Sequence, residues 1–254
     1  MVNNFSDKLY LSTIADDAAE LARKYGLGIE LAEFCTALNM DTEFPQNDAR
    51  VRNEMQGVER FIFHAPFNEL CPSAIDPLIV GVAKKRYAQA YDLICGYGIN
   101  KMIVHSGFVP MIYFEEWFVE KSIGFWKEFL ADKPDGLRLY LENVLENSPG
   151  MLIDIVAAVN DERLRLCLDI GHVALIESDI PITEWAAQML PFLGHIHLHN
   201  NCGIRDTHNA LGDGTIDVAA VLRMIADSSP DVTFTIETSD ATSSVEWLKT
   251  NGFL

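Results

Sequence analysis

Short apolar runs alternate along this chain with longer segments in which apolar residues recur every three or four positions. The short runs predict eight strands, at Lys8–Leu11, Leu27–Ala32, Arg60–His64, Lys101–His105, Leu137–Glu142, Leu164–Asp169, His195–His199 and Thr233–Glu237. The longer segments predict eight helices, at Asp16–Tyr25, Asp48–Gly57, Ile75–Tyr97, Phe114–Leu130, Pro149–Asn160, Ile182–Leu190, Asp217–Ala226 and Ser243–Thr250. Strands that alternate with helices are typical of βαβ units and a parallel sheet.

Eight strand–helix repeats in 254 residues match a (β/α)8 barrel better than an open doubly wound sheet. The periodicity does not show that the sheet closes, so the open sheet is the alternative. No linker or shift in composition divides the chain, and an α/β barrel of this length forms a single unit. We therefore predict the α/β class and one TIM-barrel domain over residues 1–254.

The composition of the chain, above all its charge, disfavours several classes of binding partner. The 19 Lys and Arg residues against 37 Asp and Glu residues give a net charge of −18, which disfavours a generic binder of polyanions. Residues 1–10 lack the basic tip and apolar run of an export signal, and no apolar stretch reaches the roughly 20 residues of a membrane helix. Five scattered cysteines form no CxxC pair, which favours reduced and mostly buried thiols. We expect a cytoplasmic protein that binds neither membranes nor nucleic acid.

The histidines gather where predicted strands end. All seven lie in or after such an end and none is predicted on a helix surface: His64, His105, His172, His195, His197, His199 and His208. Four carboxylates share the pattern: Glu142, Asp169, Asp206 and Glu237. In a barrel these positions meet at one mouth, where unpaired buried imidazoles and carboxylates are costly. A divalent cation would pair them, and this donor set suits zinc, manganese, iron or cobalt.

In the HIHLH run, strand alternation puts His195, His197 and His199 on one face of the sheet. We expect one of the three to bind metal and the others to line the pocket or to hold a ligand in place.

Several motifs together resemble the xylose isomerase-like TIM-barrel proteins, which include sugar phosphate isomerases and epimerases and the class II apurinic endonucleases of the endonuclease IV type. The motifs are HAPF (64–67), VHSG (104–107), LENV (141–144), LDIGH (168–172), HIHLHN (195–200), DTHNALGDGTID (206–217) and IETS (236–239). They occur in the order of the family.

The resemblance implies two ligand sets. The endonuclease branch holds three zinc ions with nine residues, which correspond to His64, His105, Glu142, Asp169, His172, His197, Asp206, His208 and Glu237. The isomerase and epimerase branch holds one metal with a quartet, which corresponds to Glu142, Asp169, His197 and Glu237. Both sets are complete, so one to three zinc or manganese ions are expected.

Three departures favour the isomerase branch. The first strand loop reads LYLSTIADD and lacks the Gly-rich, His-containing opening of the endonucleases, the segment after His64 reads APFNEL, and HNNC (199–202) replaces an NDSK-like run. The loops after the strands are acidic, with Arg205 as their only clear base. One divalent ion would leave the four carboxylates at −2 and suit a neutral polyol, whereas three would leave them at +2 and suit a phosphoester.

We expect substrate contacts from His199, Asn200, Arg205, Phe67 and Trp117, although exposed aromatics equally suit the interface of a homo-oligomer.

Three hypotheses follow. The first is a metal-dependent isomerase or epimerase of a small sugar, sugar phosphate or polyol, in which Glu142 and Glu237 are both ligands and proton-transfer groups while Asp169 and His197 anchor the ion. The second is a multi-metal phosphoesterase of the endonuclease IV type that uses all nine ligands. The third is a binding barrel without turnover.

The acidic loops generate a first prediction. We expect nucleic-acid affinity to be weak, because the loop carboxylates repel a phosphate backbone. Fluorescence anisotropy with an abasic duplex at several salt concentrations measures it. Tight, salt-sensitive binding accompanied by cleavage would favour the phosphoesterase.

Overall fold

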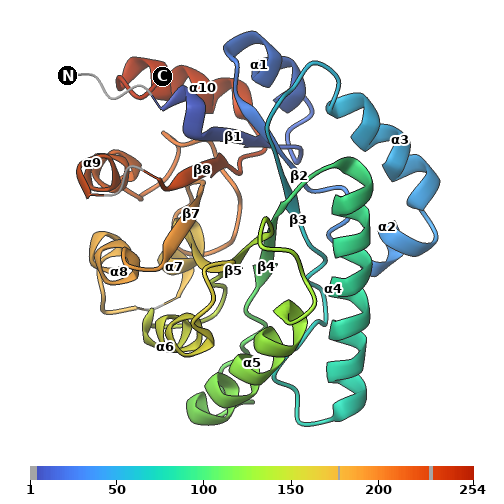
Figure 1. The fold of residues 1–254 in the computed structure, drawn as a ribbon. Helices are drawn as coiled ribbons and strands as arrows, with labels where there is room; N and C mark the ends of the chain where they lie inside the picture. The colour runs from blue at the N-terminus through green and yellow to red at the C-terminus, as the bar shows by residue number, and fades with distance from the viewer. Residues whose placement is uncertain (1–4, 177, 229–230) are drawn as a thin grey trace.

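Eight parallel strands pair in chain order and close on themselves, β8 returning to pair with β1, in a computed structural model that describes residues 5–176, 178–228 and 231–254 (Figure 1). The strands are β1 (Leu9–Ser12), β2 (Gly28–Leu31), β3 (Phe61–His64), β4 (Lys101–His105), β5 (Arg138–Glu142), β6 (Leu164–Asp169), β7 (Leu193–Leu198) and β8 (Thr233–Ile236). The predicted (β/α)8 barrel is confirmed, and the open sheet is excluded. Each strand lies within three residues of its predicted ends.

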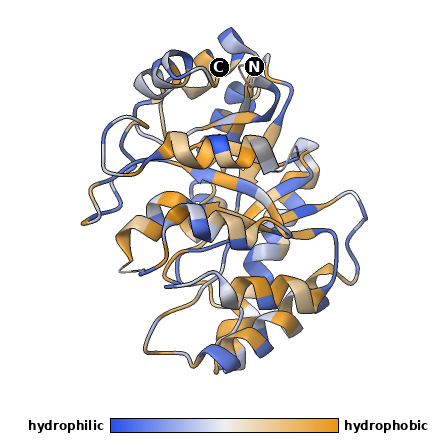
Figure 2. Ribbon diagram, turned by 90° about the vertical axis from the view of Figure 1, so that its left-hand side faces the viewer, coloured by the Kyte–Doolittle hydropathy of each residue, from blue (hydrophilic) through white to orange (hydrophobic). Residues whose placement is uncertain are grey.

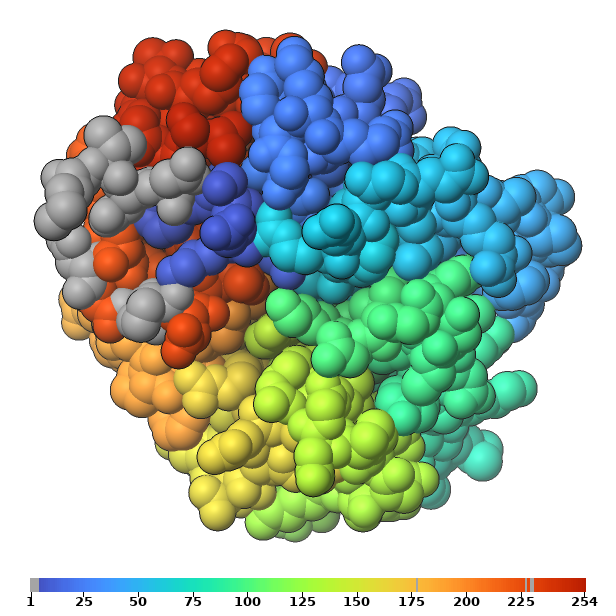
Figure 3. All heavy atoms as spheres, turned by 45° about the horizontal axis from the view of Figure 1, so that its top comes forward, coloured from blue at the N-terminus to red at the C-terminus, as the bar shows by residue number. Residues whose placement is uncertain are grey.

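Helices surround the barrel on its outer side (Figure 1). They are α1 (Ala18–Tyr25), α2 (Ala37–Asp41), α3 (Phe44–Glu54), α4 (Pro77–Tyr97), α5 (Glu115–Leu130), α6 (Gly150–Val159), α7 (Ile170–Leu175), α8 (Ile182–Met189), α9 (Val218–Ser228) and α10 (Ala241–Thr250), after a 3-10 turn η1 (Ser6–Lys8). Hydrophobic and hydrophilic residues alternate around the helices, as amphipathic packing requires (Figure 2). Helices α1 and α10 lie side by side (Figures 1 and 3), and the Phe5 backbone N–H donates to the Phe253 carbonyl at 3.1 Å.

The short helix α7 corrects one expectation. We predicted no helix directly after β6 and no histidine on a helix surface. His172 lies in α7, which begins there, and its side chain is buried. The Asp169 carboxylate accepts a hydrogen bond from the His172 backbone N–H at 2.7 Å and caps this helix. Six residues are too few for a helical period to be recognised in the sequence.

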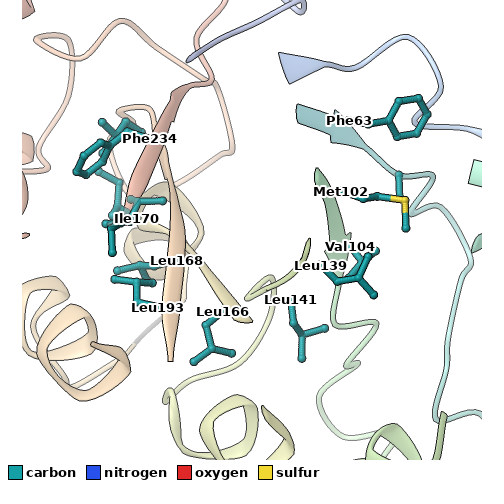
Figure 4. Packing of buried hydrophobic residues seen from close by; sticks show 14 of the residues in the cluster. Phe63, Met102, Val104, Leu139, Leu141, Leu166, Leu168, Ile170, Leu193 and Phe234 are labelled. Carbon is teal, nitrogen blue, oxygen red and sulfur yellow. The ribbon is translucent and has the colours of Figure 1, made fainter. Parts of the chain in front are cut away.

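Strand alternation separates two cores. Outward side chains such as Leu139, Leu166 and Phe234 pack beneath the helices in the large cluster (Figure 4). Inward side chains, Tyr10, Ile62, Ile103, Tyr140 and Cys167, form a small cluster inside the barrel. Above this small cluster the barrel interior becomes polar, with Glu30, His64, Glu142 and His197 all buried.

Two expectations from composition can be compared with the structure. All five cysteines are free, but only Cys167 is buried, while Cys95 and Cys202 are exposed, so the expectation of mostly buried thiols is wrong. Within the described part of the chain, no helix is both long and apolar enough to cross a membrane.

The outer core generates a stability prediction. Phe234 is fully buried and meets the Phe5 ring edge-on at 5.3 Å, so Phe234→Ala should lower the free energy of unfolding by about 3–5 kcal/mol. Phe114→Ala is the matched control, because Phe114 is 83% exposed and its loss should change stability by less than about 0.5 kcal/mol. Urea unfolding measures both, and similar losses in the two variants would contradict this account of the core.

Candidate metal centre

The Glu142 carboxylate at the end of β5 is buried among four imidazoles. Its Oε2 lies 3.5 Å from His64 Nε2 and 3.4 Å from His105 Nε2. Its Oε1 lies 3.4 Å from both His172 Nδ1 and His197 Nδ1. Glu142 Oε2 and His197 Nδ1 are buried without a hydrogen-bond partner among the described residues. Buried donor atoms of these two types that face a common space fit a divalent cation.

The quartet expected for a single ion is brought together around His197. Its Nδ1 lies 3.0 Å from Glu237 Oε2 and 3.7 Å from Asp169 Oδ2, in addition to the contact with Glu142. These four residues come from the adjacent strand ends of β5, β6, β7 and β8. The carboxyl ends of parallel barrel strands meet at one mouth, which is why residues so distant in sequence converge.

A second cluster surrounds the Asp206 carboxylate. Its Oδ2 lies 3.3 Å from His172 Nε2 and 3.2 Å from His208 Nε2, and its Oδ1 lies 3.7 Å from His199 Nε2. The other ring nitrogens are held by backbone: His172 Nδ1 donates to the carbonyl of Asn143 at 2.9 Å, and His208 Nδ1 to that of Glu237 at 2.8 Å. These hydrogen bonds direct both Nε2 atoms toward Asp206, where they could ligate an ion in place of a proton.

All nine residues of the larger ligand set therefore lie at the mouth. Eight of them, all but Asp206, belong to overlapping groups whose candidate ligand atoms are within 4.8 Å of one another, among them His64, His105 and Glu142, and Glu142, Asp169 and His172. The donor set has room for more than one ion.

Asparagine side chains hold the segments that carry the ligands. Asn143 Oδ1 accepts from the Asp169 N–H at 2.8 Å, and its Nδ2 donates to the Asp169 carbonyl at 3.0 Å, which joins β5 to β6. Asn200 donates to the carbonyls of Leu211 and Ile216 at 2.9 and 3.2 Å and so shapes the loop after β7. His208, in this loop, has a φ of 46°, a left-handed conformation that is uncommon outside glycine.

A cavity of about 490 Å³ opens above these clusters. Its wall consists of Ile14, Ala32, Cys35, His64, Phe67, His105, Glu142, Val144, His172, Asp206, His208 and Glu237. Phe67 is thus placed where a substrate contact requires it, stacked on the His105 ring at a centroid distance of 4.3 Å.

The other expected substrate contacts lie elsewhere. His199 is fully buried behind the cavity wall, with Nε2 at 3.1 Å from Asp169 Oδ1, and the Asn200 amide is occupied by its own loop. Arg205 is exposed and outside the cavity wall. Trp117 is also outside the wall and donates from Nε1 to the Ser73 carbonyl at 2.9 Å. We therefore retain only Phe67 as a proposed substrate contact.

Two charged residues near the mouth were missed. Glu30 of β2 is fully buried with Oε1 at 3.2 Å from His197 Nε2, and it is the only charged residue in the Leu27–Ala32 run, which is the signal that could have found it. Arg50 of α3 reaches Glu33 at 3.2 Å and the Thr13 carbonyl at 3.2 Å, beyond β2 and β1. The sequence placed Arg50 in a helix and so did not count it as a base near the mouth.

The imidazoles set the charge of the carboxylates. Burial alone would raise the pKa of Glu142 and Glu237, but the neighbouring histidines outweigh it and lower both pKa values, so both groups are ionised at neutral pH. Burial lowers the pKa of His105 to about 4. At His208 burial opposes protonation, but the hydrogen bond to Asp206 prevails and raises the pKa to about 9.

Gly171 allows the close approach of α7 to the His199 ring. A Cβ at this position would lie 1.9 Å from His199 Cε1, so Gly171→Ala should displace the ring or α7 and destabilise the protein by about 1–3 kcal/mol. Gly81→Ala on α4 is the control, because a Cβ there meets nothing within 4 Å and alanine favours the helix. Thermal unfolding compares them, and a Gly171 variant as stable as the Gly81 variant would contradict this packing.

The His208 pKa generates a pH prediction for the metal-free protein. Because folding raises this pKa from 6.5 to about 9, its stabilising effect is complete below pH 6.5 and is lost as the pH rises through about 9. The melting temperature of the protein, measured in the presence of a chelator, should fall as the pH rises from 6.5 to about 9. The fall should be smaller in His208→Asn, which lacks the titrating group. Asparagine is chosen because it tolerates the left-handed backbone conformation at this position. Equal pH dependence in both proteins would contradict the ion pair with Asp206.

Comparison with known proteins agrees with this architecture. The chain is 25% identical over 200 residues to the uncharacterized protein MJ1311 of Methanocaldococcus jannaschii, a match that covers 74% of this chain and 68% of that protein. The fold of this chain is similar to that of a D-tagatose 3-epimerase-like protein (TM-score 0.77, 21% identity, 96% of each chain). It is also similar to that of the Thermus thermophilus protein TTHB071 soaked with ZnCl2 (TM-score 0.76, 24% identity, 96% of this chain and 97% of that one). A family model described as xylose isomerase-like TIM barrel matches residues 4–251, and the chain therefore belongs to that family.

Proposed function

We propose that this protein is a metal-dependent isomerase or epimerase that moves a proton at a carbon beside a carbonyl group. The observation that supports the proposal best is the placement of Glu142 and Glu237. Both carboxylates line the cavity, and both contact His197 Nδ1. Their lowered pKa values keep them in the basic form that proton abstraction requires.

The quartet of Glu142, Asp169, His197 and Glu237 would hold the ion. A bound divalent ion would polarise the carbonyl and adjacent hydroxyl of the substrate, which lowers the barrier to proton removal. One glutamate would accept the proton from carbon, and the other would take up a proton from solvent and pass it to the product. The first would then release its proton to solvent, so that both glutamates end ionised. Asp169 and His197, which do not line the cavity, would anchor the ion, and His197 Nδ1 also contacts both glutamates.

The cavity wall favours a small polyhydroxy substrate. Among the described residues that line it, none is Lys or Arg, so a phosphate group would meet neither an ammonium nor a guanidinium group there. Ile14, Phe67 and Val144 supply apolar surface on which one face of a sugar can pack. A neutral sugar or related polyol fits this wall better than a sugar phosphate does.

The names of structural relatives agree with this substrate class. Besides the D-tagatose 3-epimerase-like protein, they include a D-allulose 3-epimerase from Methylomonas sp. in complex with D-allulose (TM-score 0.67, 16% identity). The ZnCl2 soak of TTHB071 supports zinc as one candidate ion, with manganese as the other. Another relative is described as a probable 3-DHS dehydratase, so the fold alone does not decide the reaction.

Deuterium wash-in tests the proposal. Wild-type protein in heavy water should incorporate deuterium into at least one member of a panel of ketoses and aldoses. Glu142→Gln and Glu237→Gln keep an oxygen near the ion but remove the base, so exchange should fall by at least about 100-fold. His208→Ala is the comparison variant and should retain most of the exchange, because the quartet does not include it. No exchange by wild-type protein into any panel sugar would refute the proposal.

A second candidate is a multi-metal phosphoesterase, favoured by the cluster around Asp206. This cluster completes the nine-residue set, and Glu30 adds a buried carboxylate to the four that the sequence count included. With neutral imidazoles, three divalent ions would leave these five carboxylates at +1, whereas one ion would leave them at −3.

Metal stoichiometry separates the two candidates. Elemental analysis of protein purified without chelator should find about one equivalent per chain for the isomerase and two or three for the phosphoesterase. In the second case His208→Ala should lose one ion and as much activity as Glu142→Gln, measured by phosphate release from a panel of phosphoesters.

A further inference from the structure

We infer that Glu30 is a positioning residue that fixes the ring of His197 so that Nδ1, and not Nε2, faces the quartet. The inference rests on the proposed metal quartet and adds a residue that lies outside it. Glu30 comes from β2, whereas the quartet comes from β5 to β8.

The geometry around His197 is asymmetric. On one side, Nδ1 faces Glu237 at 3.0 Å and Glu142 at 3.4 Å and has no hydrogen-bond partner among the described residues. On the other side, Nε2 lies 3.2 Å from Glu30 Oε1 and 3.3 Å from Glu30 Oε2. A carboxylate accepts hydrogen bonds only, so the Nε2–H donates to Glu30. An ion held by the quartet would take the Nδ1 lone pair in place of a proton, while Nε2 keeps its hydrogen.

Glu30 is itself held from below. Thr235 Oγ1 donates to Glu30 Oε2 at 2.6 Å, and the same hydroxyl lies 2.9 Å from His195 Nε2. His195 Nδ1 in turn contacts Thr233 Oγ1 at 2.7 Å. Glu30, Thr235, His195 and His197 are all fully buried, so water does not compete for these hydrogen bonds.

This polar column explains why a carboxylate occupies the barrel interior. A buried carboxylate without partners is costly, and an apolar residue at this position would avoid that cost. Every group between Thr233 and His197 instead has a neighbour within hydrogen-bond distance. A carboxylate that accepts from a ligating imidazole orients the ring and makes its other nitrogen a stronger ligand.

Metal affinity tests the role of Glu30 without reference to turnover. In cobalt titrations against a competing chelator, Glu30→Gln should bind the quartet ion about 10–100-fold more weakly than wild-type protein. The visible absorption of the cobalt form should also change, because it reports the ligand field at the ion. Wild-type affinity and an unchanged spectrum in Glu30→Gln would overturn the inference.

Variants of the anchoring threonines separate positioning from general stability. Thr235→Val removes the hydroxyl that holds Glu30 and should weaken cobalt binding, whereas Thr235→Ser keeps the hydroxyl and should restore it. Thr233→Val is the matched control: it removes a hydroxyl from the same column next to His195 but leaves Glu30 in place. It should lower the melting temperature of the metal-free protein while leaving cobalt affinity within about twofold of wild type.

Each outcome decides the inference. If Glu30→Gln does not fold, the comparison of Thr235→Val with Thr233→Val stands in its place, and equal cobalt affinity in these two variants would overturn the inference. Failure of wild-type protein to bind cobalt would also overturn it. If cobalt binding depends on Glu30 but no sugar exchanges deuterium, the inference holds and the proposed reaction fails.

Discussion

The buried charge of Glu142 is the constraint on which the mouth of this barrel depends. Its carboxylate is almost completely excluded from water, and no lysine or arginine lines the cavity above it among the described residues. Such a charge persists in a protein only when opposite charge or strong donors surround it. Here the donors are four imidazoles, which come from β3, β4, α7 and β7. The stabilisation of the Glu142 carboxylate therefore requires these four elements and β5 to be in their places around the barrel.

The same alternation that builds the outer core supplies the polar interior. In β8, Phe234 and Ile236 face the helices while Thr233 and Thr235 face inward, and β7 repeats this arrangement with Ile196 between two inward histidines. The lower interior combines branched aliphatic residues, which are typical of barrels, with Tyr10 and Tyr140, and the polar column rises from it to the mouth. Stability and chemistry thus occupy opposite faces of the same strands.

Much of this arrangement could be predicted from the sequence, because strand ends are visible in the apolar pattern and a closed barrel brings them together. His64, His105, Glu142 and Glu237 were placed in this way. The short helix α7 could not be predicted, since its start depends on a capping contact and not on periodicity. Glu30 and Arg50 were missed for a related reason: which side chain reaches the site from mid-strand or from a helix is decided by tertiary packing.

Asp169 has two tasks that cannot be changed separately. One of its oxygens caps α7 by accepting from the His172 N–H, and the other faces His197. An engineer who exchanged this carboxylate for a softer donor, in order to alter which metal the barrel prefers, would also release the start of the helix that carries His172. The Glu237 side chain has no such second task, because His208 is held by the Glu237 backbone carbonyl. A change of donor type at Glu237 would therefore disturb the local fold less than one at Asp169, but it would also remove one of the two proposed proton-transfer groups.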